Sequence, residues 1–478
     1  MPHPPAARRH ALAGVCAVVV LGAAFLDVPR AAPLPLLDVA VIDQDPAVDQ
    51  PDPAAFRSRY VAIDFEILPD RAAGPERGVR TAPMRLDLFP DVVVEAIFER
   101  FDPHPHPSGV AWVGRVTGVP GSHVTLAWSG GLLAGSVVTP AASYAIRPAP
   151  DDVRYAGPDP GRALHLVSQV NPAGFRPEAP PIEVETATDD PARPALAQPA
   201  DTADVVDLLV VYTAAAAAHA GRGIGIANLI GLGVSETNTS YEASGVLHRI
   251  RLVQAVEVPH EETGSLGASL TALRAGTASL EDVAGLRNAF GADLVLMLVH
   301  PESADFCGIA FLMTNVSQTF APSGYSVVDT GCVSGHTVAH ELGHNMGLRH
   351  DWYMDTGVTP FTYAHGYVNT EPGQRWRTIM AYPNMCSEQG FGCTRLLRWS
   401  NPDDRFEIDC GRGFNCALLR YWYFPGTPLG VPAGTSTACQ RGNTLNPKCD
   451  ADERRALNNT ALTVANFRQG VVPLGSLR

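Results

Sequence analysis

Lysine is nearly absent from this 478-residue sequence, which contains only Lys448. The residue before it is Pro447, so the Gly-Lys pair of a phosphate-binding P-loop does not occur. The same scarcity argues against a lysine that forms a Schiff base with its substrate. The serine-nucleophile pattern G-x-S-x-G is also missing. These absences argue against several common enzyme classes before any positive motif is considered.

Positive charge is scarce as well. The chain has 35 Lys and Arg residues against 49 Asp and Glu residues, so its formal net charge is −14 at pH 7. Proteins that bind DNA or RNA usually present a basic surface that neutralises phosphates. The composition therefore predicts no nucleic-acid partner. The length suits two to three domains and a sizeable core.

The apolar run at the N-terminus, residues 11–25, is shorter than the roughly 20 residues that span a bilayer. It follows Arg8 and Arg9 and precedes a pair of small residues, an order typical of a secretory signal peptide. We therefore expect residues 1–32 to be a signal peptide and the protein to be secreted. No stable membrane insertion is expected after the signal is removed.

Cysteine is absent between this leader and Cys307. No pair of the later cysteines has the C-x-x-C spacing of a structural zinc site, and a secreted protein meets an oxidising environment, so disulfides are expected. Short loops suggest the pairs Cys386–Cys393 and Cys410–Cys416, while sequence alone leaves other connectivities open. The disulfide candidates are Cys307, Cys332, Cys386, Cys393, Cys410, Cys416, Cys439 and Cys449.

The chain divides into two regions of different periodicity. Short alternating apolar runs separated by glycine and proline predict a β-rich domain over residues 33–170. These runs are residues 92–97, 110–116, 124–128 and 132–138. Residues 171–203 are rich in Pro, Ala and acidic residues with little periodicity, so we expect an exposed linker and a cleavage region there.

Residues 204–470 form the second region. Apolar segments predict strands at residues 205–212, 246–258 and 292–300, and helical segments are expected at residues 213–240 and 266–290. Alternating strands and helices predict an α/β domain with a central sheet covered by helices. After residue 351 the chain becomes irregular and rich in cysteine, with one last helical stretch near residues 456–468.

The residues that predict a chemistry lie in one short segment. His340 and His344 are four apart, so on a helix they differ by only about 40° and roughly 6 Å, and both rings can reach one metal ion. Glu341 follows the first histidine and is placed to take a proton from a bound water. His350 can join them only if the helix ends, and Gly347 permits this because glycine adopts the left-handed conformation without strain.

This pattern, H-E-x-x-H-x-x-G-x-x-H, resembles the metzincin clan of zinc peptidases, and the Asp351 that follows it resembles the reprolysin-like members. Residues 378–382, Thr-Ile-Met-Ala-Tyr, are similar to the clan's Met-turn, with Met380 as its methionine. The wider stretch of roughly 205–470 is similar to bacterial secreted peptidyl-Asp metalloendopeptidases. The segments that carry this similarity are residues 208–212, 307–310, 363–367, 399–402 and 464–467.

The resemblance implies an α/β (α+β) metzincin catalytic domain with a central twisted sheet, an active-site helix and a Met-turn, preceded by a small β-rich pro-domain. It implies a secreted zinc metalloendopeptidase made as a proenzyme, with protein or peptide substrates and its own pro-region as inhibitor. One catalytic Zn²⁺ is expected on His340, His344 and His350, with Glu341 as general base. Tyr382 is a candidate for oxyanion support. Calcium binding is left open by the sequence.

The resemblance also implies a preference for aspartate after the scissile bond, which needs a cationic partner. Arg395 and Arg398 follow the Met-turn and are candidates, although either could be a solvated surface charge. His336 and His365 are interpreted as structural histidines. Pro-region latency through a cysteine thiolate is excluded, which leaves His104, His106 and several aspartates as alternatives.

The alternative to an enzyme is a catalytically silent binding protein at the cell surface that keeps the metzincin fold. Its expected mark is the loss of Glu341 or of one of the three histidines. All four residues are present in the sequence. The pattern therefore favours the peptidase.

Overall fold

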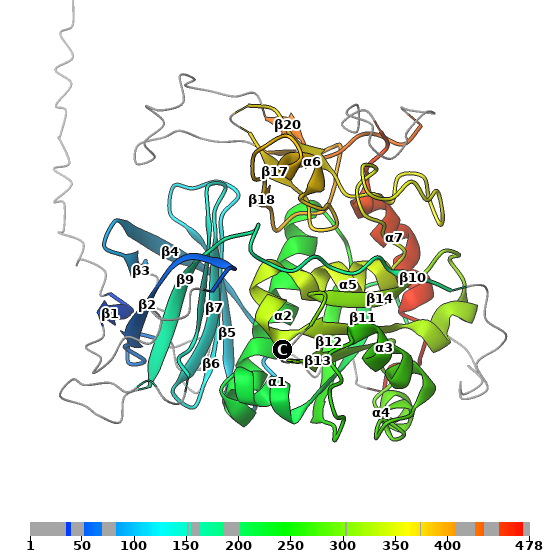
Figure 1. Cartoon of the computed structure of the whole chain (residues 1–478), viewed down its shortest axis with the longest axis horizontal. Helices are drawn as coiled ribbons and strands as arrows, with labels where there is room; N and C mark the ends of the chain where they lie inside the picture. The colour runs from blue at the N-terminus through cyan, green and yellow to red at the C-terminus, as the bar shows by residue number, and fades with distance from the viewer. Residues whose placement is uncertain are drawn as a thin grey trace, which may run out of the picture.

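The computed structural model of the chain folds as two units that lie side by side (Figure 1). It describes residues 35–39, 52–68, 83–150, 153, 163–184, 201–301, 304–372, 374–406, 426–434 and 449–471. The expected signal peptide, residues 1–32, lies outside the described residues, as do residues 185–200 of the expected linker. Within the described ranges, no helix is both long enough and apolar enough to cross a membrane.

The first unit is a nine-stranded antiparallel sheet in the order β1-β2-β9-β8-β7-β6-β5-β4-β3. A bridge between Pro35 and Arg85 joins its two edges, so the sheet curls around its own apolar core. Gly130 and Gly131 form the tight turn between β6 and β7, where φ values of 55° and 76° favour glycine. The strands are β1 (Leu37–Val39), β2 (Ala55–Ile63), β3 (Met84–Phe89), β4 (Val92–Asp102), β5 (Val110–Val116), β6 (His123–Ser129), β7 (Leu132–Val138), β8 (Ser143–Pro148) and β9 (Leu164–Val170).

The second unit is built on a six-stranded sheet in the order β10-β14-β15-β13-β11-β12. Its strands are β10 (Ile182–Glu183), β11 (Val205–Tyr212), β12 (Arg249–Glu257), β13 (Leu294–Val299), β14 (Gly308–Leu312) and β15 (Tyr325–Asp329). Strands β12, β11, β13 and β15 are parallel neighbours, and β14 joins β15 antiparallel. Every residue of β13 is buried, as expected for a parallel strand covered on both faces. The prediction of an α/β fold is confirmed.

Helices cover this second sheet and connect it to the first unit. Helix α2 contacts β5, β6 and β7 on one side and β12 and α5 on the other, so it lies between the two units. It ends at Gly245, whose φ of 75° is left-handed. The helices are α1 (Ala214–His219), α2 (Arg222–Ser244), α3 (Leu266–Ala275), α4 (Val283–Ala289), α5 (Thr337–Asn345), α6 (Asn384–Ser387) and α7 (Glu453–Val464).

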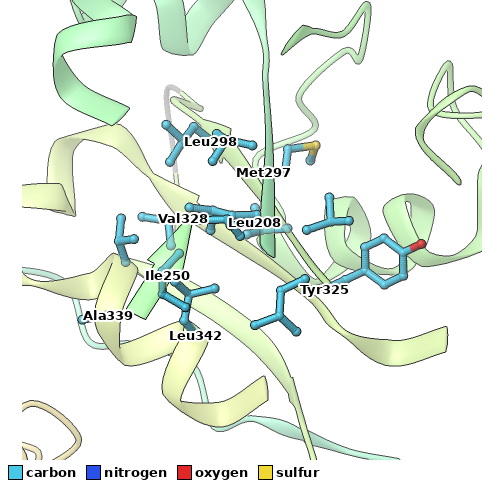
Figure 2. Close-up of a cluster of buried hydrophobic side chains, with 14 of the residues drawn as sticks. Leu208, Ile250, Met297, Leu298, Tyr325, Val328, Ala339 and Leu342 are labelled. Atoms are coloured by element: carbon cyan, nitrogen blue, oxygen red, sulfur yellow. The ribbon is translucent and has the colours of Figure 1, made fainter. Parts of the chain in front are cut away.

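The core of the second unit holds α5 against the sheet. Leu208 of β11 and Val328 of β15 are fully buried and belong to the same cluster as Ala339 and Leu342 of α5 (Figure 2). Burial of a leucine or valine side chain contributes about 1.5–3 kcal/mol. The position of α5, which carries the histidine motif, is therefore set by this apolar contact.

The remaining part of the second unit consists of short elements and disulfides. The bridges are Cys307–Cys332 and Cys386–Cys393, with Cα atoms 5.5 and 5.9 Å apart, and the second pair is the one suggested by its short loop. Cys449 is also disulfide-bonded, whereas the suggested pair Cys410–Cys416 lies outside the described residues. The short elements are η3 (Gln318–Ser323), η4 (Thr330–Gly335), β16 (Val368–Asn369), β17 (Trp376–Arg377), β18 (Thr394–Arg395), β19 (Arg405–Phe406) and β20 (Thr427–Pro428).

Candidate metal centre and active site

The histidine motif lies on α5 and on the turn that follows it. The helix ends at Met346, and Gly347 then adopts a φ of 88°. The N–H of Gly347 donates to the carbonyl of His344 at 2.9 Å, which closes the turn. A Cβ on Gly347 would lie 2.9 Å from Pro360 Cγ, so both backbone conformation and space require glycine there. The chain thereby reverses direction after α5, which brings His350 back beside the two histidines of the helix.

Three buried imidazoles meet at this turn. Nε2 of His350 lies 3.2 Å from Nε2 of His340 and 3.1 Å from Nε2 of His344. In the described part of the chain, these three residues form the one cluster of three or more side chains that could hold a metal ion. Four ligands arranged tetrahedrally about 2.0–2.1 Å from zinc are separated by roughly 3.4 Å. The observed separations are close to that value, so the residues fit a zinc ion.

The protonation state of the three histidines also suits a metal. Nδ1 of His340 donates to the carbonyl of Ile379 at 3.0 Å, and Nδ1 of His344 donates to the carbonyl of Leu348 at 2.8 Å. These bonds leave the Nε2 lone pairs directed at the centre of the cluster. Burial lowers the pKa of all three imidazoles, that of His344 to about 4. They are neutral at physiological pH, the form that binds metal.

Glu341 lies beside the cluster and faces strand β14. Its side chain is completely buried, and neither carboxylate oxygen has a hydrogen-bond partner among the described residues. Burial, with a smaller effect of the nearby Glu178, raises the pKa of Glu341 well above its ordinary value. Gly308 on β14 leaves space for this carboxylate, because a Cβ there would collide with it. A buried carboxylate without a protein donor is suited to accept a proton.

The segment expected to form the Met-turn packs against α5, because a Cβ on Gly343 would lie 2.8 Å from Met380 Sδ. Met380 is fully buried, and the N–H of Ala381 donates to the carbonyl of Thr378 at 3.1 Å to close the turn. Asp351 links this turn to the motif, because its carboxylate accepts from the N–H of Tyr382 at 2.8 Å. Burial raises the pKa of Asp351 to about 6. The aspartate after His350 therefore has a structural reason: it holds the Met-turn against the metal-binding segment.

Tyr382 lies at the edge of the same cluster. Its ring centroid is 4.0 Å from that of His350. Its hydroxyl donates to the carbonyl of Glu178 at 2.5 Å. Burial raises the pKa of Tyr382 well above its ordinary value, so the hydroxyl keeps its proton. Tyr382, the candidate for oxyanion support, therefore presents a protonated hydroxyl group close to the three histidines.

Residues 177–183, from the expected linker, run alongside strand β14 next to this site. The N–H of Cys307 donates to the carbonyl of Pro177 at 2.8 Å, and the N–H of Ala179 donates to the carbonyl of Gly308 at 2.9 Å. Farther along, β10 pairs in parallel with β14. The expectation that residues 171–203 are exposed is wrong for Glu178 and Ala179, which are 6% and 2% exposed. The unpaired backbone groups of the edge strand β14 account for the difference, because they bind an extended chain.

Arg395 makes an ion pair with the carboxylate of this Glu178. Its guanidinium also donates to the carbonyl of Ile379 at 2.9 Å and to that of Gly335 at 2.8 Å. Of the two arginines singled out in the sequence, Arg395 is therefore at the site. Arg398 makes no contact with Glu178 in the described residues, and its pKa is lowered mainly by burial.

The sequence did not indicate Glu178 or Arg377. Arg377 is 4% exposed and donates to the carbonyl of Ala381 at 2.5 Å. Burial, with a smaller effect of Arg395, lowers the pKa of Arg377 to about 9. Arg377 directly precedes residues 378–382, so its place in the sequence could have indicated that it lies at the site. Glu178 lies in a segment without any periodic pattern, so no such indication was present.

The other histidines considered in the sequence lie outside the cluster. His336 has Nδ1 3.4 Å from a carboxylate oxygen of Glu236 on α2. The two ring nitrogens of His365 face backbone carbonyls: Nδ1 is 2.7 Å from that of His350 and Nε2 is 2.8 Å from that of Gly357. It is fully buried and acts as a packing residue that supports His350.

His104 and His106 do not reach the cluster either. Nε2 of His104 lies 3.1 Å from the side-chain oxygen of Asn228 on α2, and His106 bonds to Ser108. The segment around Glu178, which lies between the N-terminal unit and β11, approaches the histidines instead.

Comparison with known proteins agrees with the site. Residues 202–401 match the family described as Metallo-peptidase family M12B Reprolysin-like. The peptidyl-Asp metalloendopeptidase of a Stenotrophomonas maltophilia strain is 30% identical over 353 residues, which are 73% of this chain and 71% of that protein. The peptidyl-Asp metalloendopeptidase of Pseudomonas aeruginosa is 32% identical over 286 residues, or 56% of this chain and 41% of that protein.

Among solved structures, metalloproteinase-II from Bacteroides fragilis overlaps with a TM-score of 0.36 at 9% identity, over 58% of this chain and 82% of that chain. So partial an overlap adds nothing to the relationship seen in the sequences. The motif, the geometry of the three histidines and the extent of the sequence similarity point the same way. This chain belongs to the reprolysin-like M12B family of metallopeptidases and is a zinc-dependent peptide hydrolase.

Proposed function

We propose that this protein is a secreted endopeptidase, made as a proenzyme, in which His340, His344 and His350 hold one catalytic zinc ion and Glu341 is the general base. The observation that carries the proposal is the convergence of three neutral Nε2 atoms, 3.1 and 3.2 Å apart, beside a buried carboxylate without a protein donor. A silent binding protein would have no need to keep that carboxylate buried.

Zinc, when bound, lowers the pKa of a water molecule towards 7 and polarises the substrate carbonyl. Glu341 accepts the proton of the attacking water and delivers it to the leaving amine. The carbonyls of Ile379 and Leu348 fix the orientation of His340 and His344 through their Nδ1 protons. Once the carbonyl of Glu178 has left, the hydroxyl of Tyr382 is free to donate to the developing oxyanion.

Three observations support secretion as a proenzyme. The leader pattern in residues 1–32 and the disulfides at Cys307–Cys332 and Cys386–Cys393 suit an oxidising compartment. The segment around Glu178 lies where an extended substrate would pair with strand β14. Its removal, by cleavage of the chain between this segment and β11, is then the activating step.

We further propose that the enzyme prefers aspartate on the carboxyl side of the scissile bond. The support is the similarity to proteins described as peptidyl-Asp metalloendopeptidases, together with a buried arginine beside the site. A digest of a denatured protein by the processed enzyme tests the preference. Enrichment of aspartate at the new N-termini is expected, and its absence would end this part of the proposal.

The roles of Glu341 and the histidines are separated by two variants. Glu341→Ala is expected to abolish casein hydrolysis while keeping one zinc per molecule, because the residue is a base and not a ligand. Glu281→Ala, which changes an exposed glutamate before α4, is the matched control and should retain both activity and zinc. Appreciable hydrolysis by Glu341→Ala would overturn the mechanism, and loss of zinc would assign Glu341 to metal binding instead.

A further inference from the structure

Glu178 and Arg395 form a buried ion pair next to the metal centre. Each residue is 6% exposed, and the carboxylate also accepts from the hydroxyl of Thr337 at 3.3 Å. Burial disfavours the charged carboxylate, but Arg395 and Arg377 outweigh burial and hold the pKa of Glu178 below its ordinary value. A buried carboxylate without such partners costs several kcal/mol. This position therefore accepts an acidic side chain because two arginines face it.

The two arginines line a hollow that continues beside the site. A cavity of ≈ 270 Å³ is lined on one side by Arg377, Arg395, Pro383 and Asn384 and on the other by Glu178 and its neighbours back to Val170. Glu178 comes from the segment that runs alongside β14, whereas the first four residues belong to the peptidase unit. Removal of the segment would open this cavity and leave the guanidinium groups of Arg377 and Arg395 on its remaining wall.

This pocket is linked to His340 through Arg395. Nε of Arg395 donates at 2.9 Å to the carbonyl of Ile379, the same carbonyl that accepts from Nδ1 of His340 at 3.0 Å. The backbone carbonyl of Glu178 accepts from the hydroxyl of Tyr382, whose ring contacts that of His350. The backbone of Glu178 thus binds the tyrosine that packs on His350, while its carboxylate reaches Arg395.

The segment reaches this position as an extended chain on the edge strand β14. Its backbone bonds to Cys307 and Gly308 immediately before the pocket, and β10 continues the pairing after it. An extended peptide that adds to a sheet edge gains affinity from its backbone and specificity from the side chains that enter pockets. Pairing of the segment with β14 positions the side chain of Glu178 next to Arg395 and Arg377.

We propose that Arg395, assisted by Arg377, is the specificity-determining residue that binds the acidic side chain of the substrate, and that Glu178 occupies its place in the proenzyme as a substrate mimic. The inference rests on the proposed endopeptidase function and gives its aspartate preference a structural cause. Arginine suits the role because its planar guanidinium meets a carboxylate through two hydrogen bonds.

The test uses processed enzyme and three peptides that differ only in the residue after the scissile bond, which is Asp, Asn or Leu. The wild type is expected to cleave the Asp peptide with a kcat/KM roughly tenfold to a hundredfold above that of the Asn peptide, the range of a hydrogen bond to a charged group. Arg395→Leu should bring this ratio towards one while cleavage of the Leu peptide continues. Arg395→Lys, which keeps the charge, should recover part of the ratio.

Arg398→Leu is the matched control, because it removes a neighbouring arginine that makes no contact with Glu178 in the described residues. It should leave the Asp-to-Asn ratio unchanged. A structural role of Arg395 would lower all three rates together and leave the ratio intact. An intact ratio in Arg395→Leu would therefore overturn the inference, whereas a wild type that cleaves no peptide would overturn the proposed function itself.

A second measurement does not depend on the folding of any variant. A synthetic peptide of residues 175–184 is added to the processed wild type and compared with the same peptide carrying Gln at position 178. The natural peptide is expected to inhibit cleavage of the Leu substrate at least about tenfold better, because only it carries a carboxylate at position 178. Equal inhibition by the two peptides would refute the role of Glu178 as a mimic.

Discussion

Gly343 and Met380 approach each other so closely that no side chain fits between them. A Cβ on Gly343 would lie 2.8 Å from Met380 Sδ and 3.1 Å from Trp399 Cζ3. Gly343 precedes His344 on α5, and Met380 is the methionine of the turn that packs against this helix. This contact sets the distance between the helix and the turn that accepts the proton of His340 Nδ1.

Gly343→Ala is predicted to push α5 away from the Met-turn. The overpacking should destabilise the protein by about 1–3 kcal/mol and weaken zinc binding, since the histidines move with the helix. Gly285→Ala in α4 is the control, because a Cβ there meets no atom within 4 Å. It should stabilise the helix by up to ~1 kcal/mol. Urea unfolding and zinc content of both variants test this, and an unchanged Gly343→Ala protein would contradict it.

A metal-binding histidine and a packing histidine should respond differently to the same substitution. His350→Ala is predicted to lose zinc and activity, because the remaining two histidines leave the site short of a ligand. His365→Ala is expected to lose stability, since its ring bridges the carbonyls of His350 and Gly357, but to bind zinc when the metal is added. Metal analysis after dialysis against zinc separates the two. Retention of zinc by His350→Ala would contradict the ligand assignment.

The fold and the metal site could be predicted because their signals are local. The strands of the second sheet appear as apolar runs, and the spacing of His340 and His344 places both on one face of a helix whatever surrounds it. Even the return of His350 follows from one glycine. The apolar runs therefore predicted the buried strands β11 and β13, whereas β12 at the edge of the sheet is only partly buried.

The pairing of Glu178 with Arg395 could not be predicted in this way. The two residues are 217 positions apart, and the contact forms only because β14 is an edge strand that binds an extended segment. Nothing in a Pro-rich stretch identifies which of its acidic residues will be buried. For the same reason Arg395 and Arg398, which look alike in the sequence, were left as equal candidates until their surroundings were known.

The two disulfides are predicted to differ in their effect on stability. Cys307–Cys332 closes a loop with a sequence separation of 25, and Cys386–Cys393 one of 7. Loop-closure entropy gives roughly 3.5 kcal/mol for the first and about 2.4 kcal/mol for the second. Replacing each pair with serines in the inactive Glu341→Ala protein, which prevents self-digestion, allows urea unfolding to compare them. A larger loss for the Cys386–Cys393 pair would contradict the loop-length argument.

The stability that Glu178 contributes should depend on pH in one direction. Burial opposes its charge, but Arg395 and Arg377 lower its pKa below the ordinary 4.5. A carboxylate with a lowered folded pKa contributes stability that is present above its unfolded pKa and is lost as the pH falls through the folded value. The thermal stability gap between the full chain and its Glu178→Gln variant should therefore be constant from neutral pH to about pH 5 and shrink below it.

Both proteins in this comparison carry Glu341→Gln, which prevents cleavage of the chain and removes the titration of the one carboxylate that lowers the stability of charged Glu178. Because Glu178 raises the pKa of His344 and His350, both proteins are measured saturated with zinc, which these histidines bind in their neutral form. A gap that widens as the pH falls would mean that Glu178 is held in its protonated form. The carboxylate would then be no mimic of a charged aspartate, and the arginines would have to serve a structural purpose.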